Sequence, residues 1–200
     1  MKRRVFDNEA KKRIAELVSG VLTILPFNAY ERVDLRFEHI GEGTFTDIKI
    51  GAVNRAPYIL IVNINWYETA DEEDIRFLIR HEARHLYQRN QVEMLQTGKP
   101  LFETRDTVMQ WARNLASGNY IENTPETELQ YFQQLCEFDA YCFATFVSNV
   151  ERVTPQGCNI QYTNYPGIGE AMVQQVAKMI QATPYENILK YREFFIKQRA

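Results

Sequence analysis

Two hydrophobic periods divide the chain into a strand region and a helical region. Residues 32–38 and 44–50 alternate polar and apolar side chains, which is typical of half-buried strands, and the turn signal at residues 41–43 favours a hairpin between them. Residues 57–65 (PYILIVNIN) are rich in β-branched residues and almost continuously apolar. We therefore expect the most buried strand of a small sheet in this segment.

Helical patterns lie on both sides of these strands. An amphipathic helix is predicted over residues 8–19, with Asn8 as its N-cap. The later helices are predicted at residues 71–90, 103–115, 125–150, 168–182 and 184–198. Thr124-Pro125 has the form of a cap followed by proline at the first helical position. The pattern predicts an α+β fold: a small antiparallel-type sheet of about three strands packed on a helix, followed by a mostly helical C-terminal half.

Length and composition favour one domain. The chain has 200 residues, with only 9 glycines and 7 prolines, and it contains no internal repeat. We expect a single domain over residues 1–200, with its core at about 30–150 and with the helices at 8–19 and 168–198 as extensions. A weak boundary falls in the loop-like segment 154–167.

Charge and hydropathy argue against a nucleic-acid-binding, membrane-spanning or exported protein. Lys and Arg number 23 against 26 Asp and Glu, so we expect no nucleic-acid partner, because such proteins are usually basic. No apolar run approaches the roughly 20 residues that span a bilayer, and charged residues follow the MKRR start where an export signal would be apolar. The cysteines, an odd number, indicate reduced thiols in a cytoplasmic protein. They are Cys136, Cys142 and Cys158.

Residues 81–85 read HEARH, an HExxH motif within a predicted helix. Positions four apart lie on one helix face, so His81 and His85 can bind one metal ion. Zinc accepts two imidazoles and a third protein donor and leaves a place for water. Glu82 lies about 100° around the helix from His81, where it can act as general base on that water. The alternative is a pair of exposed histidines on a solvated helix.

The third metal ligand is left open by spacing alone. His39 is the remaining histidine and precedes the motif. Two carboxylates, Glu137 and Asp139, stand in the otherwise apolar segment 135–147, where an unpaired charge is costly. A downstream carboxylate is therefore the favoured ligand.

HEARH followed by Glu137-x-x-Ala140-Tyr141-x-Phe143-Ala144 resembles the gluzincin metallopeptidases, most closely the ImmA/IrrE-type domain. The resemblance covers residues 30–150 and implies zinc bound by His81, His85 and Glu137. Asp139 takes the place of the second acidic residue, as a runner-up ligand or a partner of a zinc-binding histidine. Tyr141 departs from the usual Asn or Asp. YILIVNIN resembles the edge strand that lines the substrate cleft in this family.

Further candidates surround this motif. Tyr141 is a tentative oxyanion donor or support for the metal site, and other oxyanion donors are Tyr131, Tyr162, Tyr165 and Arg84. Arginines at 76, 80 and 84 recur at four-residue steps. We interpret them as a solvated face paired with Glu72, Glu73 or a neighbouring element.

These observations support two functional hypotheses. The first is a zinc-dependent peptidase that hydrolyses a peptide bond in a cytosolic protein or peptide with a metal-activated water. The second is a catalytically silent, metallopeptidase-like module that binds a partner peptide by strand addition along YILIVNIN and acts in regulation. In either case the 91–125 segment or the C-terminal helices could cover the cleft.

Overall fold

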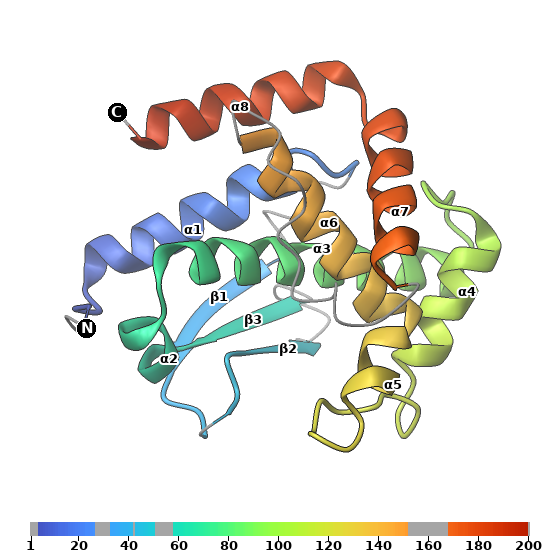
Figure 1. The fold of residues 1–200 in the computed structure, drawn as a ribbon, viewed down its shortest axis with the longest axis horizontal. Coiled ribbons are helices and arrows are strands. Elements are labelled where there is room, and N and C mark those ends of the chain that lie inside the picture. The colour runs from blue at the N-terminus through green and yellow to red at the C-terminus, as the bar shows by residue number, and fades with distance from the viewer. Residues whose placement is uncertain (1–3, 27–32, 42, 51–57, 152–167, 200) are drawn as a thin grey trace. The chain divides into compact units, whose positions relative to one another are not determined.

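The computed structural model describes residues 4–26, 33–41, 43–50, 58–151 and 168–199. These residues form eight α-helices and a three-stranded sheet, so the predicted α+β class is confirmed (Figure 1). None of the described helices combines the length and the apolar character needed to cross a membrane. Two compact units emerge: Met1–Leu86 with Tyr185–Ala200, and Tyr87–Pro184. That the whole chain is one domain remains a prediction.

The sheet of the first unit places its most apolar strand in the centre. The strands are β1 (Val33–Glu38), β2 (Thr46–Ile50) and β3 (Tyr58–Asn63), in the order β1-β3-β2 (Figure 1). β3 pairs in parallel with β1 and antiparallel with β2, so the sheet is mixed rather than antiparallel throughout. Five of its six residues are buried, as predicted.

Two expectations about these strands are wrong. β1 and β2 do not form a hairpin, because β3 lies between them. A strand that is apolar on both faces loses most by exposure, and the central position removes it from water. β3 is therefore not an edge strand. A partner peptide cannot add to it, because both of its sides already carry strand neighbours.

Four helices belong wholly or partly to this unit: α1 (Asn8–Leu22), α2 (Ile64–Thr69), the first part of α3 (Glu72–Gln96) and α8 (Tyr185–Arg199). The N-cap of α1 is Asp7 rather than Asn8: its carboxylate accepts from the Ala10 backbone N–H at 2.9 Å. α1 contacts α8, and the absence of a side chain at Gly20 leaves room for the Phe194 ring.

The second unit is helical. It contains the end of α3 and the helices α4 (Arg105–Asn114), α5 (Glu128–Gln133), α6 (Leu135–Glu151) and α7 (Ile168–Ala182). The single helix predicted over residues 125–150 is two helices, because Gln134 is extended, with ψ 129°. The predicted start at Thr124 is also wrong, since α5 begins at Glu128. Trp111 of α4 is fully buried, edge-on to Tyr87 of α3 at 6.3 Å.

Some predictions fall outside the described residues: the boundary at 154–167 and the candidates Cys158, Tyr162 and Tyr165. Cys136 and Cys142 are buried free thiols, in agreement with the predicted reduced state.

Candidate metal centre

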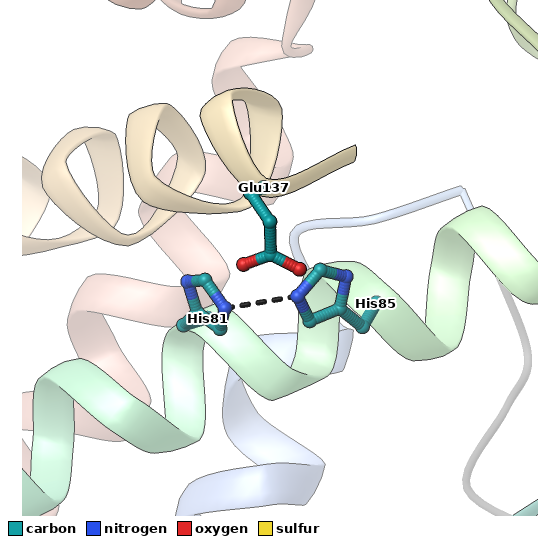
Figure 2. A group of neighbouring side chains, drawn as sticks. All are labelled: His81, His85 and Glu137. Carbon is teal, nitrogen blue, oxygen red and sulfur yellow. Dashed lines mark hydrogen bonds between the residues drawn. The ribbon is translucent and has the colours of Figure 1, made fainter. Parts of the chain in front are cut away.

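The HEARH motif lies in the middle of α3, a continuous 25-residue helix. His81 and His85 are 4% and 8% exposed, and their Nε2 atoms are 2.9 Å apart (Figure 2). The two rings meet edge to face, and their Nε2 atoms face each other in a hydrogen-bond contact (Figure 2). The alternative of two solvent-exposed histidines is wrong.

A third donor, Glu137, stands in the first turn of α6 and is fully buried. Gln88, one turn beyond His85 on α3, belongs to the same unit as α6. Its side-chain amide donates to the Cys136 carbonyl at 2.9 Å and to Asp139 Oδ2 at 2.8 Å. These two hydrogen bonds tie the residues on either side of Glu137 to α3. Figure 2 draws the Glu137 carboxylate together with the two histidine rings.

His81, His85 and Glu137 each offer one ligand atom, and these atoms all lie within 4.8 Å of one another. In a tetrahedral zinc site the ligand atoms lie about 2.0–2.1 Å from the metal and about 3.3 Å from one another. Two imidazoles and a carboxylate are donors that zinc and other first-row transition metals accept. This buried group could therefore bind a metal ion.

Glu82 is 8% exposed and has a partner from the sheet. The Thr46 hydroxyl, at the first residue of β2, donates to Glu82 Oε1 at 2.7 Å. Glu82 is not a member of the metal-binding group. Thr46 carries no local sequence signal, because it lies 36 residues before the glutamate that it contacts.

Tyr120 is a hydrogen-bond partner of Glu137 that sequence reasoning missed. Its hydroxyl, in the connection between α4 and α5, donates to Glu137 Oε1 at 2.8 Å. Tyr131 of α5 packs edge-on against Tyr120, with ring centroids 6.2 Å apart, and also hydrogen-bonds with the Glu137 side chain. Burial, and then the negative charge of Glu137, raise the pKa of both phenols well above the usual value. Both therefore remain neutral hydrogen-bond donors.

The other candidates stand apart from the three-residue group. Asp139 accepts from Gln88 and is not a member of the group. Tyr141 is half-buried and lies edge-on to Phe132 at 5.4 Å. His39 is exposed, and its Nδ1 contacts the Asn65 side chain at 2.9 Å.

Two further residues near the motif are buried. Arg84 is 7% exposed. Burial, and then the Glu137 charge, raise the pKa of the Cys136 thiol to about 12, so this thiol stays protonated at neutral pH.

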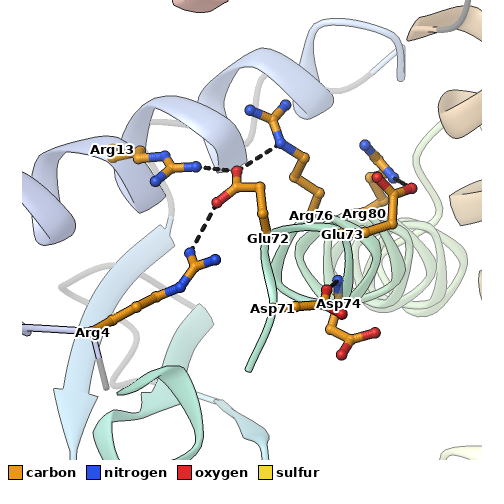
Figure 3. Close-up of polar contacts among 8 residues, drawn as sticks. All are labelled: Arg4, Arg13, Asp71, Glu72, Glu73, Asp74, Arg76 and Arg80. Carbon is orange, nitrogen blue, oxygen red and sulfur yellow. Dashed lines mark hydrogen bonds and ion pairs between the residues drawn. The ribbon is translucent and has the colours of Figure 1, made fainter. Parts of the chain in front are cut away.

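The arginines of α3 are not a solvated face, contrary to our interpretation. Arg76 and Arg80 are 8% and 1% exposed. The predicted pairing is correct: Arg76 Nε donates to Glu72 at 2.7 Å, and Arg80 lies 3.8 Å from Glu73 (Figure 3). Arg4 and Arg13 also pair with Glu72. Neighbouring helices cover this side of α3, and the Arg76 guanidinium lies over the Phe195 ring of α8 at 5.0 Å.

Comparison of the chain with protein-family models, with curated proteins and with solved structures finds no match. The candidate metal centre therefore rests on its own residues.

Proposed function

We propose that the protein is a zinc-dependent peptidase of the HExxH gluzincin type, acting on a protein or peptide substrate. One observation carries the proposal: two imidazoles from one helix and a buried carboxylate from another converge within 4.8 Å, next to a second carboxylate, Glu82, that is not a member of the group.

The donor chemistry favours zinc. Magnesium and calcium bind oxygen-rich sites, whereas two of the three donors here are imidazole nitrogens. Structural zinc sites are closed by four protein ligands, and catalytic sites use three. His81, His85 and Glu137 supply three, which fits a catalytic site.

Each group of the site has its own role in the proposed peptide hydrolysis. A zinc ion bound by these residues would lower the pKa of a water molecule and polarise a substrate carbonyl. Glu82 takes the proton from the attacking water and returns it to the leaving amine. The Thr46 hydroxyl holds one oxygen of Glu82, which leaves the other oxygen for this proton.

Glu82→Gln tests the proposal. The change removes the base but none of the three donors, so bound zinc should be retained while hydrolysis is lost. Zinc is measured in protein purified without chelator, and cleavage with a library of quenched fluorescent peptides of random sequence. Glu93→Gln, on the same helix, is the matched control and should keep both properties.

Two results would contradict the proposal. Wild-type protein without zinc affinity removes the metal centre. Zinc-loaded wild-type protein that cleaves no peptide, and that Glu82→Gln leaves unchanged, favours the catalytically silent module instead.

A further inference from the structure

The carboxylate of Glu137 is held by a side chain from another part of the chain. Glu137 Oε1 accepts the Tyr120 hydroxyl at 2.8 Å, and the other oxygen, Oε2, is buried as well. Tyr120 lies seventeen residues earlier, in the connection between α4 and α5. A hydrogen bond to one oxygen makes the two carboxylate oxygens different.

A second contact fixes the connection at this point. The Gln134 side chain, 5% exposed, accepts from the Ile121 N–H and donates to the Ile121 carbonyl, both at 2.9 Å. Gln134 is the extended residue between α5 and α6, so the break between these helices directs its amide at the connection. Ile121 follows Tyr120 directly. Gln134, three residues before Glu137, thus holds the backbone of Ile121 at two points. This contact fixes the position of the neighbouring Tyr120 phenol.

We propose that Tyr120 is a positioning residue that makes Glu137 a one-oxygen zinc ligand, with Gln134 holding Tyr120 in place. This inference rests on the proposed function. We expect the phenol to hold Oε1 and the ion to bind through Oε2. A carboxylate that used both oxygens would fill the coordination place that water or substrate requires.

The chemistry of the partner suits this task. Lys or Arg at the same place would offset the negative charge that attracts a cation, whereas a neutral phenol donates a hydrogen bond and leaves that charge on Glu137. The edge-on contact with Tyr131 fixes the plane of the Tyr120 ring. Groups that orient metal ligands in this way typically contribute about 10- to 100-fold in metal affinity.

Tyr120→Phe is the test, because it removes the hydroxyl and keeps the ring. We expect zinc affinity, measured by competition with a chromogenic chelator, to fall about 10- to 100-fold. Cobalt substituted for zinc reports coordination number, since four-coordinate cobalt absorbs visible light more strongly than five- or six-coordinate cobalt. The variant should show weaker visible absorption per bound cobalt than wild type.

Tyr87→Phe is the matched control. It also removes a phenol that donates to a glutamate, Glu103, at 3.2 Å, but Glu103 is not in the metal-binding group. We expect unchanged zinc affinity and an unchanged cobalt spectrum. Gln134→Leu is a second variant that removes the contact with Ile121, and it should shift affinity and spectrum in the same direction as Tyr120→Phe.

The outcomes separate this inference from the proposed function. If wild-type protein binds neither zinc nor cobalt, the metal centre itself fails. If wild-type protein binds zinc, and folded Tyr120→Phe binds it equally tightly with the same cobalt spectrum, the role of Tyr120 is overturned while the proposed function stands.

Discussion

The start and the middle of α3 surround their carboxylates in different ways. At its start, Glu72 is surrounded by Arg4, Arg13 and Arg76, so the protein supplies the cations that match the carboxylate (Figure 3). In its middle, two histidine rings and a buried carboxylate form a group that could bind a metal ion (Figure 2). The neutral phenol of Tyr120 donates a hydrogen bond to that carboxylate. The first arrangement pairs one carboxylate with three arginines, and the second groups two imidazoles with one carboxylate. One helix thus carries a stabilising network and a group suited to a cation from solution.

Removing a histidine should have the largest effect on metal binding. Zinc sites with four protein ligands bind with about 10–16 kcal/mol, so one ligand contributes about 3 kcal/mol, or roughly 100-fold in affinity. We expect His85→Ala to weaken zinc binding by at least about that factor, measured by chelator competition. His39→Ala is the matched control, because His39 is exposed and contacts Asn65 instead. Equal affinity in His85→Ala and wild type would refute the metal centre.

Removing the shared carboxylate should have the largest effect on stability. Glu72→Gln leaves three arginines without their common anion. Because Glu72 is partly exposed, we expect the free energy of unfolding to fall by about 1–3 kcal/mol. Urea unfolding measures this loss, and zinc affinity should be unchanged.

Glu73→Gln is the control for Glu72→Gln. Its partner Arg80 is 3.8 Å away and Glu73 is largely exposed, so the expected loss is below about 1 kcal/mol. Loss of zinc affinity in Glu72→Gln would show that the start and the middle of α3 are coupled. It would contradict the division between a stabilising network and a metal-binding group.

A smaller effect is expected from Thr46→Val, which keeps the side-chain shape and removes the donor to Glu82. A hydrogen bond of this kind contributes about 1 kcal/mol, so peptide hydrolysis should slow roughly five- to tenfold. Zinc affinity should stay the same, and Thr46→Ser should restore most of the rate. A variant that hydrolyses peptides at the wild-type rate would remove Thr46 from the site.

The smallest expected effect is the change with acidic pH in the stability that Glu72 contributes. Burial alone would raise the pKa of Glu72, but hydrogen bonds from Arg4, Arg13 and Arg76 and the Arg13 charge outweigh it, and the pKa lies below the usual 4.5. Such a carboxyl stabilises the fold above its unfolded pKa, and this contribution is lost as pH falls through the folded pKa. The stability difference between wild type and Glu72→Gln should therefore shrink below pH 4.5, as urea unfolding at pH 7 and pH 3 would show. A difference independent of pH would contradict the ion-pair network.

Much of the fold and part of the candidate site could be predicted from local sequence patterns. The period of each segment identified the three strands and most helices, and the spacing in HEARH placed two imidazoles on one helix face. Both depend on backbone geometry within a few residues. The resemblance of the 137–144 segment also pointed to Glu137, which is a member of the buried group that could bind a metal ion. The metal itself and the peptidase activity remain proposals.

Contacts between distant segments were beyond sequence reasoning. The pattern did not reveal that β3 separates β1 and β2, because alternation describes the faces of a strand and not its neighbours. It placed Arg76 and Arg80 in solvent, although both are buried. A stripe of charged residues does not reveal whether other helices of the chain pack against it. Tyr120 and Thr46 have no motif, and their roles follow only from which oxygen each hydroxyl reaches.

By itself, the sequence determined the elements and the pair of histidines, since both follow from helix and strand periods within single segments. Only the tertiary structure decided which hydroxyls hold the two glutamates. The physical reason is that hydrogen bonds such as those of Gln88 to α6 and of Gln134 to Ile121 join residues far apart in the chain. Their partners are selected by packing and carry no local pattern.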